Sequence, residues 1–593
     1  MIRVADYIFQ ILEKNNVKHV FQVTGRGSLF LSDALAKNKN IESVSLHHEQ
    51  SCSYAATAYA DWTGGIGACL VSTGCASTNT ITGVMSAWQD GIPCVFISGQ
   101  NVLNETSRYT GLNLRTYGQQ ELDIIKLVEP ITKYSTMLEN PNDIVEVMNK
   151  AIFYALEGRK GPVWIDVPLD LQSSLIDPNK IFISEIVSVK EKKLDINQIS
   201  QVVTLINNSK RPVFLIGKGV RSAGAIDLFE KFVEEFKIPV IYSSSATDIY
   251  GLDNDLSIGS VGAMGCSRAG NFTVSNCDLL IVLGSRLSSL TTGTEFCDFA
   301  RDAKVIVVDI DKIEHSKKAI KIDLFLNSDV KLFLENLLKE NITLKSLDWV
   351  NKCIHWKKIF RNFDFSNSQE IDLYEVTDLL SELTPKNSTL VTDSGTVEVI
   401  IPTNMVFSKD MRCIHPHSQG AMGYALPASI GVQLISNSCT VVVVGDGSIM
   451  MNLQELESIR YLKLPIKIII INNNVYSIIR KRQRDLFRSR TIGTDPENGV
   501  SCPNFRDVAS CFGFNYLSIK NKSSMKDCLK TFFDMDGPVI CEIFTRQDQA
   551  YVELALTKSS VDGKLVKRPL EDQFPFIDRE LFLNEMLIKP IKQ

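Results

Sequence analysis

The sequence lacks several features that would assign it to a specialised class of protein. Its 63 Lys and Arg residues are outnumbered by 68 Asp and Glu, for a net charge of −5, so no overall basic surface predicts nucleic-acid binding. No apolar run approaches the roughly 20 residues that a membrane-spanning helix needs. The N-terminal stretch MIRVADYIFQILEKNN has helical periodicity and lacks the apolar core of a signal peptide. We therefore expect a cytoplasmic protein without membrane partners.

The cysteines form no recognisable framework. There are 14 of them, scattered along the chain without a CxxC pair. This spacing fits neither a zinc site nor a small disulfide-linked scaffold. Reduced thiols in a cytosolic protein are the simplest interpretation.

What the chain does contain is repeated alternation of short apolar runs with helical patterns. At 593 residues, it is long enough for three or four domains of roughly 150 residues. The alternation predicts an α/β fold of three doubly wound parallel-sheet domains. We place the domains at 1–185, 190–345 and 360–555, followed by a C-terminal tail at 556–593.

Two polar motifs follow neighbouring predicted strands in the third domain. Asp446 lies in VVVVGDGS, and Asn473 ends PIKIIIINN about two dozen residues later. Ligands of open α/β sheets bind beyond the carboxyl ends of the strands, so both side chains should approach one point. A carboxylate and an amide oxygen suit Mg²⁺ bound to a diphosphate, and a following helix N-terminus favours the anion. The alternative is that Asp446 only caps a helix.

This GDG and NN pairing resembles the signature of thiamine-diphosphate enzymes. Over nearly its whole length the chain is similar to the acetolactate synthase group, whose members have pyrimidine-binding, central and diphosphate-binding domains. The resemblance implies that Asp446, Asn473 and the backbone carbonyl of Val475 bind Mg²⁺, and that Met422 forces thiamine diphosphate into its bent shape. The cofactor-binding residues that it implies are Gly25, Thr73, Asn79, Gly395, Thr396, Val397, Gly420, Met422, Gly447, Ser448, Tyr476, Ser477 and Ile478.

The resemblance also implies an acid in the first domain that activates the cofactor. Glu49 lies in SLHHEQSCSYAATAYADWTG, and the text STGCASTNTITGVMSAWQDGIPCVFISGQ follows it as in the family. The resemblance implies that Glu49 protonates the pyrimidine ring, so that the thiazolium can lose its C2 proton. It also places Gln120 against cofactor or substrate and His48 beside the acid. Alternatively, Glu49 is a solvated first-turn acid and His48 a core histidine.

Several positions depart from acetolactate synthase on the side where the second substrate should bind. Gln119 replaces a phenylalanine, Leu169 a lysine and Arg482 a tryptophan. Arg482 and Arg484 belong to RKRQRDLFRSR, which holds six cations in 11 residues. This segment is either a solvated helix face or a rim that binds an anionic acceptor. The second interpretation predicts a phosphate-bearing acceptor, such as a nucleotide-linked keto sugar.

The central domain raises the question of a second cofactor. The positions that match FAD contacts in acetolactate synthases are Gly217, Gly219, Arg286, Asp311 and Asp329. The family's Gly-Met-His-Gly is GAMG here, with Met264 in place of the histidine. Some relatives dispense with FAD, so the sequence leaves its binding open.

The resulting prediction is a decarboxylating carboligase. It would take a two-carbon unit from a 2-oxo acid, most simply pyruvate, and add it to a carbonyl acceptor. The alternatives are acetolactate synthase proper, a C–C hydrolase of a cyclic dione, a simple 2-oxo acid decarboxylase and a non-enzymatic scaffold. The resemblance further implies a homo-oligomer, a dimer or tetramer, with active sites at subunit interfaces.

Overall fold

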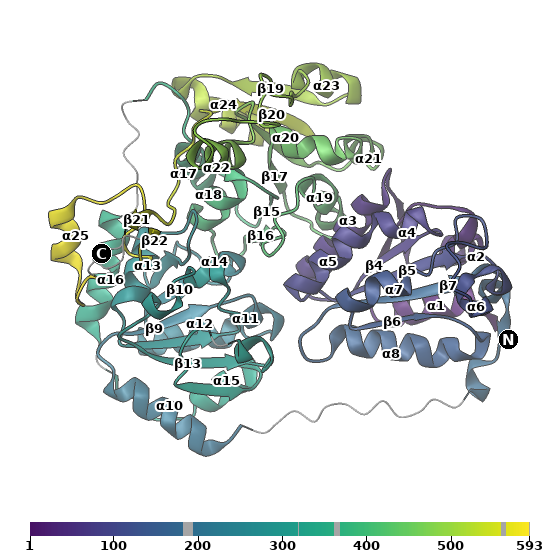
Figure 1. Cartoon of the computed structure of the whole chain (residues 1–593), viewed down its shortest axis with the longest axis horizontal. Helices are drawn as coiled ribbons and strands as arrows, with labels where there is room; N and C mark the ends of the chain where they lie inside the picture. Colours follow the sequence, from purple (N-terminus) through teal and green to yellow (C-terminus); the bar gives the residue numbers. More distant parts are fainter. Residues whose placement is uncertain (182–193, 318, 345, 361–367, 559–564, 592–593) are drawn as a thin grey trace.

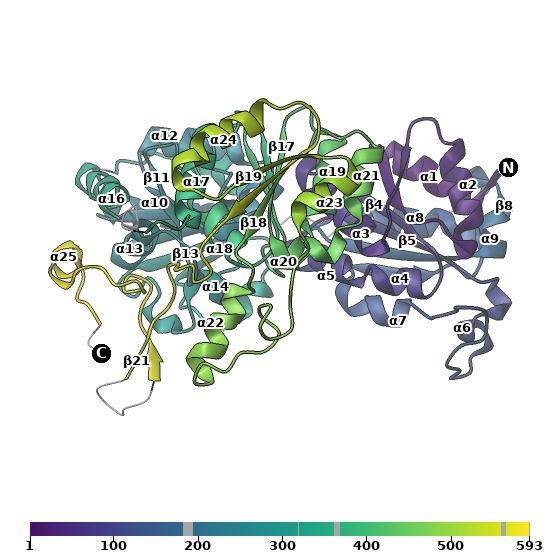
Figure 2. The same cartoon turned by 90° about the horizontal axis from the view of Figure 1, so that it is seen from above.

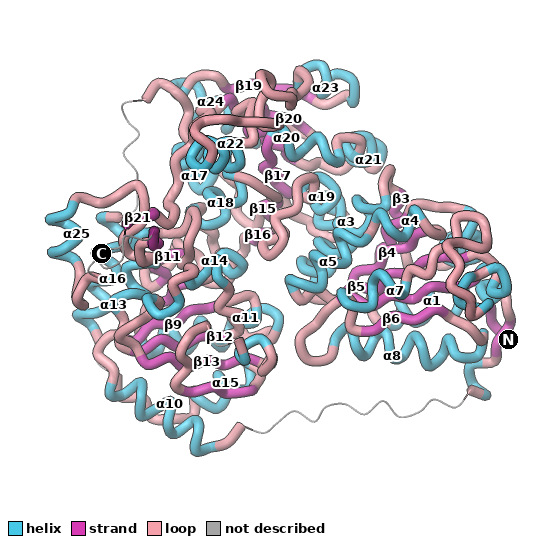
Figure 3. Tube along the Cα trace, in the orientation of Figure 1, coloured by secondary structure: helices cyan, strands magenta, loops and turns pink. Residues whose placement is uncertain are grey.

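The computed structural model describes residues 1–181, 194–317, 319–344, 346–360, 368–558 and 565–591. It contains three six-stranded sheets, each purely parallel and covered by helices on both faces (Figures 1 and 3). The predicted fold class is therefore confirmed. The predicted domain limits at 185, 190 and 345 lie outside the described residues, and the division as a whole stays a prediction.

The first sheet has the order β3-β2-β4-β5-β7-β6. Of its four inner strands, β4, β5 and β7 are buried along their whole length, as expected for strands covered on both faces. Helices α1 and α8 pack on one face, and α3 and α5 pack on the other. The strands are β2 (His19–Gln22), β3 (Glu42–Ser45), β4 (Gly67–Val71), β5 (Cys94–Gln100), β6 (Tyr134–Met137) and β7 (Pro162–Pro168), and the helices are α1 (Val4–Lys14), α2 (Leu29–Lys37), α3 (Glu49–Thr63), α5 (Ile81–Asp90) and α8 (Ile144–Leu156).

The third sheet has the order β16-β15-β17-β18-β20-β19. Helices α17, α18 and α24 cover one face, and α19, α21 and α23 cover the other. The strands are β15 (Thr389–Val391), β16 (Arg412–Ile414), β17 (Thr440–Gly445), β18 (Lys467–Asn472), β19 (Asn515–Ile519) and β20 (Val539–Phe544), and the helices are α17 (Leu373–Leu383), α18 (Thr396–Asn404), α19 (Ala425–Gln433), α21 (Glu455–Tyr461), α23 (Phe505–Phe512) and α24 (Lys522–Asp534).

Helices α3 and α19 join the first and third domains through one continuous apolar core. The two backbones touch, because a Cβ added to Gly431 of α19 would lie 2.2 Å from the carbonyl oxygen of Ala55 in α3. The rings of Tyr54 and Tyr424 pack edge to face beside this contact, with centroids 5.1 Å apart. The first and third domains are thus held together at the helix that begins with Glu49.

The central sheet has a different order, β11-β10-β9-β12-β13-β14. With strands numbered in chain order within each domain, the first and third sheets both read 2-1-3-4-6-5, whereas the central sheet reads 3-2-1-4-5-6. The latter is the usual order of dinucleotide-binding domains. The strands are β9 (Pro212–Ile216), β10 (Val240–Tyr242), β11 (Ser257–Ser260), β12 (Leu279–Leu283), β13 (Lys304–Asp309) and β14 (Leu324–Asn327), and the helices are α10 (Ile196–Asn208), α12 (Ile226–Phe236), α13 (Arg268–Asn276), α15 (Val330–Leu337) and α16 (Leu347–Ile359).

The C-terminal segment lies over the central domain, at the end of the molecule opposite the N-terminus (Figure 2). The carboxylate of Glu585 in α25 (Arg579–Glu585) accepts hydrogen bonds from Lys352 and Trp356 of α16.

No helix in the described part of the chain is long and apolar enough to cross a membrane. The remaining strands and α-helices are β1 (Ile2–Arg3), β8 (Leu175–Ile176), β21 (Leu556–Lys558), β22 (Leu565–Lys567), α4 (Cys75–Asn79), α6 (Ser107–Thr110), α7 (Ile125–Val128), α9 (Leu169–Ser173), α11 (Gly219–Ser222), α14 (Ser289–Thr292), α20 (Asp446–Ile449) and α22 (Ser477–Leu486).

Candidate active site

The third sheet gathers three of the predicted polar motifs at one edge. From β15 the chain crosses to β16 on one side and later to β17 on the other, so a crevice opens between the carboxyl ends of β15 and β17. Gly395 follows β15, Asp446 follows β17 and Asn473 follows β18. The residues predicted to hold a diphosphate and a metal ion are therefore brought together.

Asp446 has the geometry of an anchored ligand. Its Oδ1 accepts a hydrogen bond from the backbone N–H of Gly447 at 2.8 Å, and its Oδ2 accepts one from Asn474 N–H at 2.6 Å. Each carboxylate oxygen keeps a second lone pair for a further contact. Burial raises the pKa of Asp446 to about 6. A cation at this carboxylate would favour the ionised form, as a metal site requires.

The second predicted ligand side chain is fixed by its own turn. Asn473 is buried, and its Oδ1 accepts a hydrogen bond from Val475 N–H at 3.1 Å. The set of one carboxylate, one amide and the Val475 carbonyl consists of hard oxygens, which fit Mg²⁺. Elsewhere in the described residues, no three His, Cys, Asp or Glu side chains are grouped to hold a metal ion.

Gly447 is required at the turn for packing. A Cβ at this position would lie 2.1 Å from Cε1 of Tyr476, so only glycine lets the tyrosine ring lie against the turn. Tyr476, Ser477 and Ile478 form the N-terminal end of the ten-residue helix α22. Such an end favours anions.

The structure adds Asp393, which the sequence interpretation missed. Its carboxylate accepts hydrogen bonds from Ser448 Oγ at 2.6 Å and from Gly423 N–H at 3.1 Å. Burial raises the pKa of Asp393 to about 6. Through these two hydrogen bonds, Asp393 connects the turn after β15 to the turn that contains Met422 and to helix α20. A signal was available, because Asp393 follows a predicted strand just as Asp446 does.

A buried carboxylate also supports the Met422 turn. Glu398 lies in α18, and a Cβ added to Gly420 would lie 3.2 Å from its Oε2. Its Oε1 is 3.4 Å from Nδ1 of His415. Burial raises the pKa of Glu398. Gly420 therefore lies directly against an acid that the sequence interpretation did not include.

The first domain presents Glu49 at the start of α3. Nδ2 of Asn79 donates a hydrogen bond to Oε2 of Glu49 at 2.9 Å. Asn79 ends the short helix α4, and Cys75, which begins it, lies 4.0 Å from Nε2 of Gln120. Gln120 has a φ of +61°, a conformation that costs about 1 kcal/mol or more for a non-glycine residue and often marks functional sites. Glu49, Asn79 and Gln120 thus lie along one rim.

The same rim continues to two of the predicted acceptor residues. Nδ2 of Asn101 donates to the backbone carbonyl of Gln119 at 2.9 Å, and Leu169 N–H donates to the carbonyl of Asn101 at 3.3 Å. The Oε1 of Gln119 accepts a hydrogen bond from Arg26, which the sequence interpretation missed. Gly25 follows β2 and Thr73 follows β4. These two strands are neighbours in the first sheet, at the point where the strand order reverses.

The two halves of the site meet through Asn452. Its Nδ2 donates to the carbonyl of Gly423 at 2.9 Å and to Oε1 of Gln50 at 3.1 Å, and its Oδ1 accepts from Ser51 Oγ at 3.1 Å. The N-terminus of α3, with Glu49, is thereby fixed beside the Met422 turn. The Nδ1 atom of His48 is buried without a hydrogen-bond partner among the described residues, so its role stays a prediction.

The cations of α22 are paired with acids of the segment that follows β20. Arg482 and Lys481 form ion pairs with Glu553, at 3.2 and 2.7 Å, and Arg484 pairs with Asp548 at 3.0 Å. Arg480, which is buried, also pairs with Asp548. The charges of Arg482 and Arg484 are thus partly neutralised, and their roles at the acceptor stay predictions.

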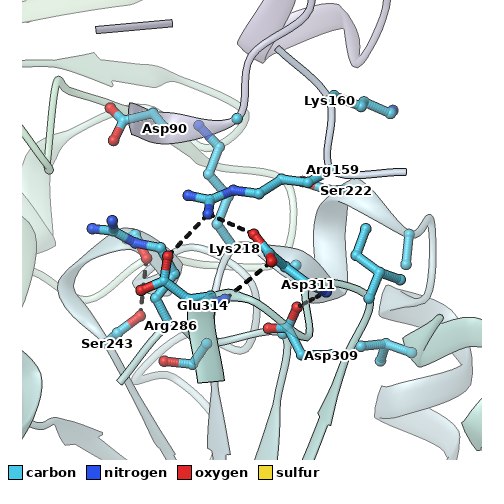
Figure 4. Close-up of a pocket in the computed structure, with 18 of the residues that line it drawn as sticks. Asp90, Arg159, Lys160, Lys218, Ser222, Ser243, Arg286, Asp309, Asp311 and Glu314 are labelled. Carbon is cyan, nitrogen blue, oxygen red and sulfur yellow. Dashed lines mark hydrogen bonds and ion pairs between the residues drawn. The ribbon is translucent and has the colours of Figure 1, made fainter. Parts of the chain in front are cut away.

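A separate cavity of about 710 Å³ lies where the first, central and third domains meet (Figure 4). Four of the five predicted FAD-contacting residues line it, namely Gly219, Arg286, Asp311 and Asp329. Gly217 lies beneath it, where a Cβ would come within 2.3 Å of the carbonyl oxygen of Gly284. The cavity sits at the switch point between β9 and β12, where such domains bind dinucleotides.

The lining of this cavity is strongly charged. Nη1 of Arg159, from the first domain, reaches Oδ2 of Asp311 at 3.0 Å and Oε2 of Glu314 at 3.1 Å (Figure 4). Nη2 of Arg286 donates to Ser418 Oγ of the third domain at 3.1 Å. The size, the sheet order and the position of Arg286 fit a phosphorylated nucleotide.

Comparisons with known proteins agree with this geometry. Three family models match: the N-terminal TPP binding domain of thiamine pyrophosphate enzymes over residues 2–127, their central domain over 199–337, and their C-terminal TPP binding domain over 393–543. Similar proteins include the acetolactate synthase large subunit of Porphyra purpurea, 31% identical over 94% of both chains. The large subunit from Lactococcus lactis is 28% identical over 92% of this chain and 93% of its own. The chloroplastic acetolactate synthase of Arabidopsis thaliana is 30% identical over 91% of this chain and 81% of its own.

Proposed function

The chain belongs to the thiamine pyrophosphate enzymes, as an enzyme of the acetolactate synthase type, and on that premise we propose that it transfers a two-carbon unit from a 2-oxo acid to an anionic keto acceptor. The donor is most simply pyruvate. The acceptor carries phosphate, as a nucleotide-linked keto sugar does.

One observation carries this proposal. The N-terminus of α3, which bears Glu49, is held by Asn452 against the turn that contains Met422. The helix that begins with the proposed acid and the segments proposed to hold the cofactor in the third domain therefore pack together, which supports a site built from these two domains, and the mixed-variant experiment below decides whether both come from one chain. When bound, thiamine diphosphate supplies the electron sink that makes loss of CO₂ from the 2-oxo acid feasible.

The chain's own residues would hold the cofactor and move one proton. Asp446, Asn473 and the Val475 carbonyl would bind Mg²⁺ on the diphosphate, and the N-terminus of α22 would face the same anion. Glu49 would exchange a proton with the ring of the cofactor, while Asn79 fixes the orientation of its carboxylate.

A product assay tests the proposed reaction. The purified protein is supplied with thiamine diphosphate, Mg²⁺ and pyruvate, with and without a nucleotide-linked keto sugar. We expect CO₂ release and a branched product when the sugar is present. Acetolactate alone would indicate acetolactate synthase proper, acetaldehyde alone a decarboxylase, and cleavage of a cyclic dione without CO₂ a hydrolase. Each of these three results would refute the proposed acceptor.

We further propose that the cavity of about 710 Å³ binds FAD. Purified protein, or protein reconstituted with FAD, should show bound flavin by its visible absorbance. Arg286→Ala should weaken flavin retention about tenfold, because it removes a guanidinium from the cavity wall, and should leave thiamine diphosphate affinity unchanged. Absence of flavin in both preparations would refute this assignment.

The exposure of the rim supports a homo-oligomer. Cys75, Asn79, Gln119 and Gln120 are exposed in the single chain, although a cofactor at this rim requires enclosure from water. The adjoining segment also exposes large apolar side chains, among them Tyr109, Leu112 and Tyr117. We propose that a second copy covers this surface and completes each active site.

A further inference from the structure

Arg26 is an exposed cation at the rim of the site. It follows β2 within the short turn 26–28, between Gly25 and Gly27. Its Nη1 donates to Oε1 of Gln119, a neutral group. In the described part of the chain, none of the ion pairs includes Arg26. The full positive charge of the guanidinium is therefore left at the rim.

The arginines of α22 differ from Arg26 because they take part in ion pairs. Arg482 and Arg484 each pair with a carboxylate of the segment that follows β20. An anionic ligand would meet a positive charge that Glu553 or Asp548 already neutralises in part. Among the residues that the structure describes, Arg26 has no such competitor, so a ligand anion would gain the whole interaction.

The position of Arg26 relates it directly to the catalytic acid. A series of contacts runs from Arg26 to Gln119, on to Gln120 and Cys75, and along α4 to Asn79, which binds Glu49. Helix α4 has five residues and is therefore only about 7 Å long. One small acceptor molecule is therefore long enough to contact the side chain of Arg26 at one end and to react near Glu49 at the other.

We propose that Arg26 binds the anionic group of the acceptor, an inference that rests on the proposed carboligase function. The acceptor is favoured over the donor for an electrostatic reason. The carboxylate of a 2-oxo acid loses its charge as CO₂ leaves, so a cation paired with it would stabilise the ground state and slow decarboxylation. The anion of the acceptor keeps its charge throughout carbon–carbon bond formation.

Gln119 acts as a positioning residue for this contact. It holds one arm of the guanidinium without neutralising it, and its own backbone carbonyl is fixed by Asn101. The remaining N–H groups of Arg26 can then bind two oxygens of a phosphate side by side. The structure thus connects Gln119 to Arg26, whereas the sequence indicated only that Gln119 replaces a phenylalanine of acetolactate synthases.

Steady-state kinetics with matched acceptors test the proposal. The acceptors are a nucleotide-linked keto sugar, a ketose phosphate and the corresponding uncharged ketose. Arg26→Gln should raise KM for the two anionic acceptors about ten- to a hundredfold, with a much smaller effect on the uncharged ketose. Arg26→Lys should restore part of the affinity. Gln119→Ala should raise the same KM less, and its effect should largely vanish in the Arg26→Gln background.

The controls separate this inference from the proposed function. Arg506→Gln removes an exposed arginine of α23 that is distant in sequence, and it should leave all three KM values unchanged. A nucleoside diphosphate should inhibit competitively with the acceptor in the wild type and much less in Arg26→Gln. If the wild type forms no ligation product with any acceptor, the proposed function fails. If it does form product and Arg26→Gln leaves KM for the anionic acceptors unchanged, only the role of Arg26 is refuted.

Discussion

Replacing Glu49 with Gln is expected to lower turnover about 100- to 10,000-fold, the range that a positioned acid–base group contributes. Glutamine has nearly the same shape, and its carbonyl oxygen can still accept the hydrogen bond from Nδ2 of Asn79. The variant therefore keeps the local structure and loses only the ability to exchange a proton. The measurement is kcat for CO₂ release from pyruvate, at saturating thiamine diphosphate and Mg²⁺.

Two controls give this result its meaning. Glu42→Gln makes the same substitution at the start of β3, seven residues before α3 begins, and the side chain of Glu42 is 62% exposed. It should leave kcat unchanged. The melting temperature and cofactor affinity of Glu49→Gln should match those of the wild type. Wild-type turnover in Glu49→Gln would overturn the assignment of the catalytic acid.

Replacing Asp446 with Asn should raise the Mg²⁺ and thiamine diphosphate concentrations needed for half-maximal activity by at least about 100-fold. The amide can accept only one of the two hydrogen bonds from Gly447 and Asn474, and it removes the negative charge that would face the metal. Cofactor binding can be followed directly by quenching of intrinsic fluorescence. Asp485→Asn, an exposed acid of α22, is the matched control and should bind cofactor normally.

The two variants together test whether active sites form between subunits. Glu49→Gln and Asp446→Asn proteins are unfolded together, refolded and assayed. If each site takes Glu49 from one chain and Asp446 from another, a mixed dimer has one intact site, and random pairing restores about a quarter of wild-type sites. No recovery, with mixed oligomers confirmed by differently sized tags, would mean that each chain builds its own site.

The candidate site was predictable where residues follow buried strands. The run VVVVGDGS became β17 with Asp446 at its end, and PIKIIIINN became β18 with Asn473 at its end. Both predictions used local pattern and one topological rule. Asp393 obeys the same rule after β15 and could have been found.

Other features have no local signature. Asn452 is one polar residue in a turn, and its partner Gln50 lies about 400 positions earlier. The arginines of α22 gave a clear charge pattern, but their partners Asp548 and Glu553 follow a strand more than 50 residues later. Pattern alone shows which charges are present, whereas tertiary packing decides which of them remain unpaired.

The first and third sheets share a strand order that the central sheet does not have. An identical 2-1-3-4-6-5 order in the first and third domains, packed against each other through α3 and α19, is what duplication of one ancestral domain would leave. The central domain, with another order, would then be a later insertion between the two copies. After the third strand of each copy, one copy has Ser72 and Thr73 and the other has Asp446 and Gly447. On this account the two copies differ in their proposed roles, the third domain holding the diphosphate and the first domain providing the proton-transferring acid and the acceptor rim.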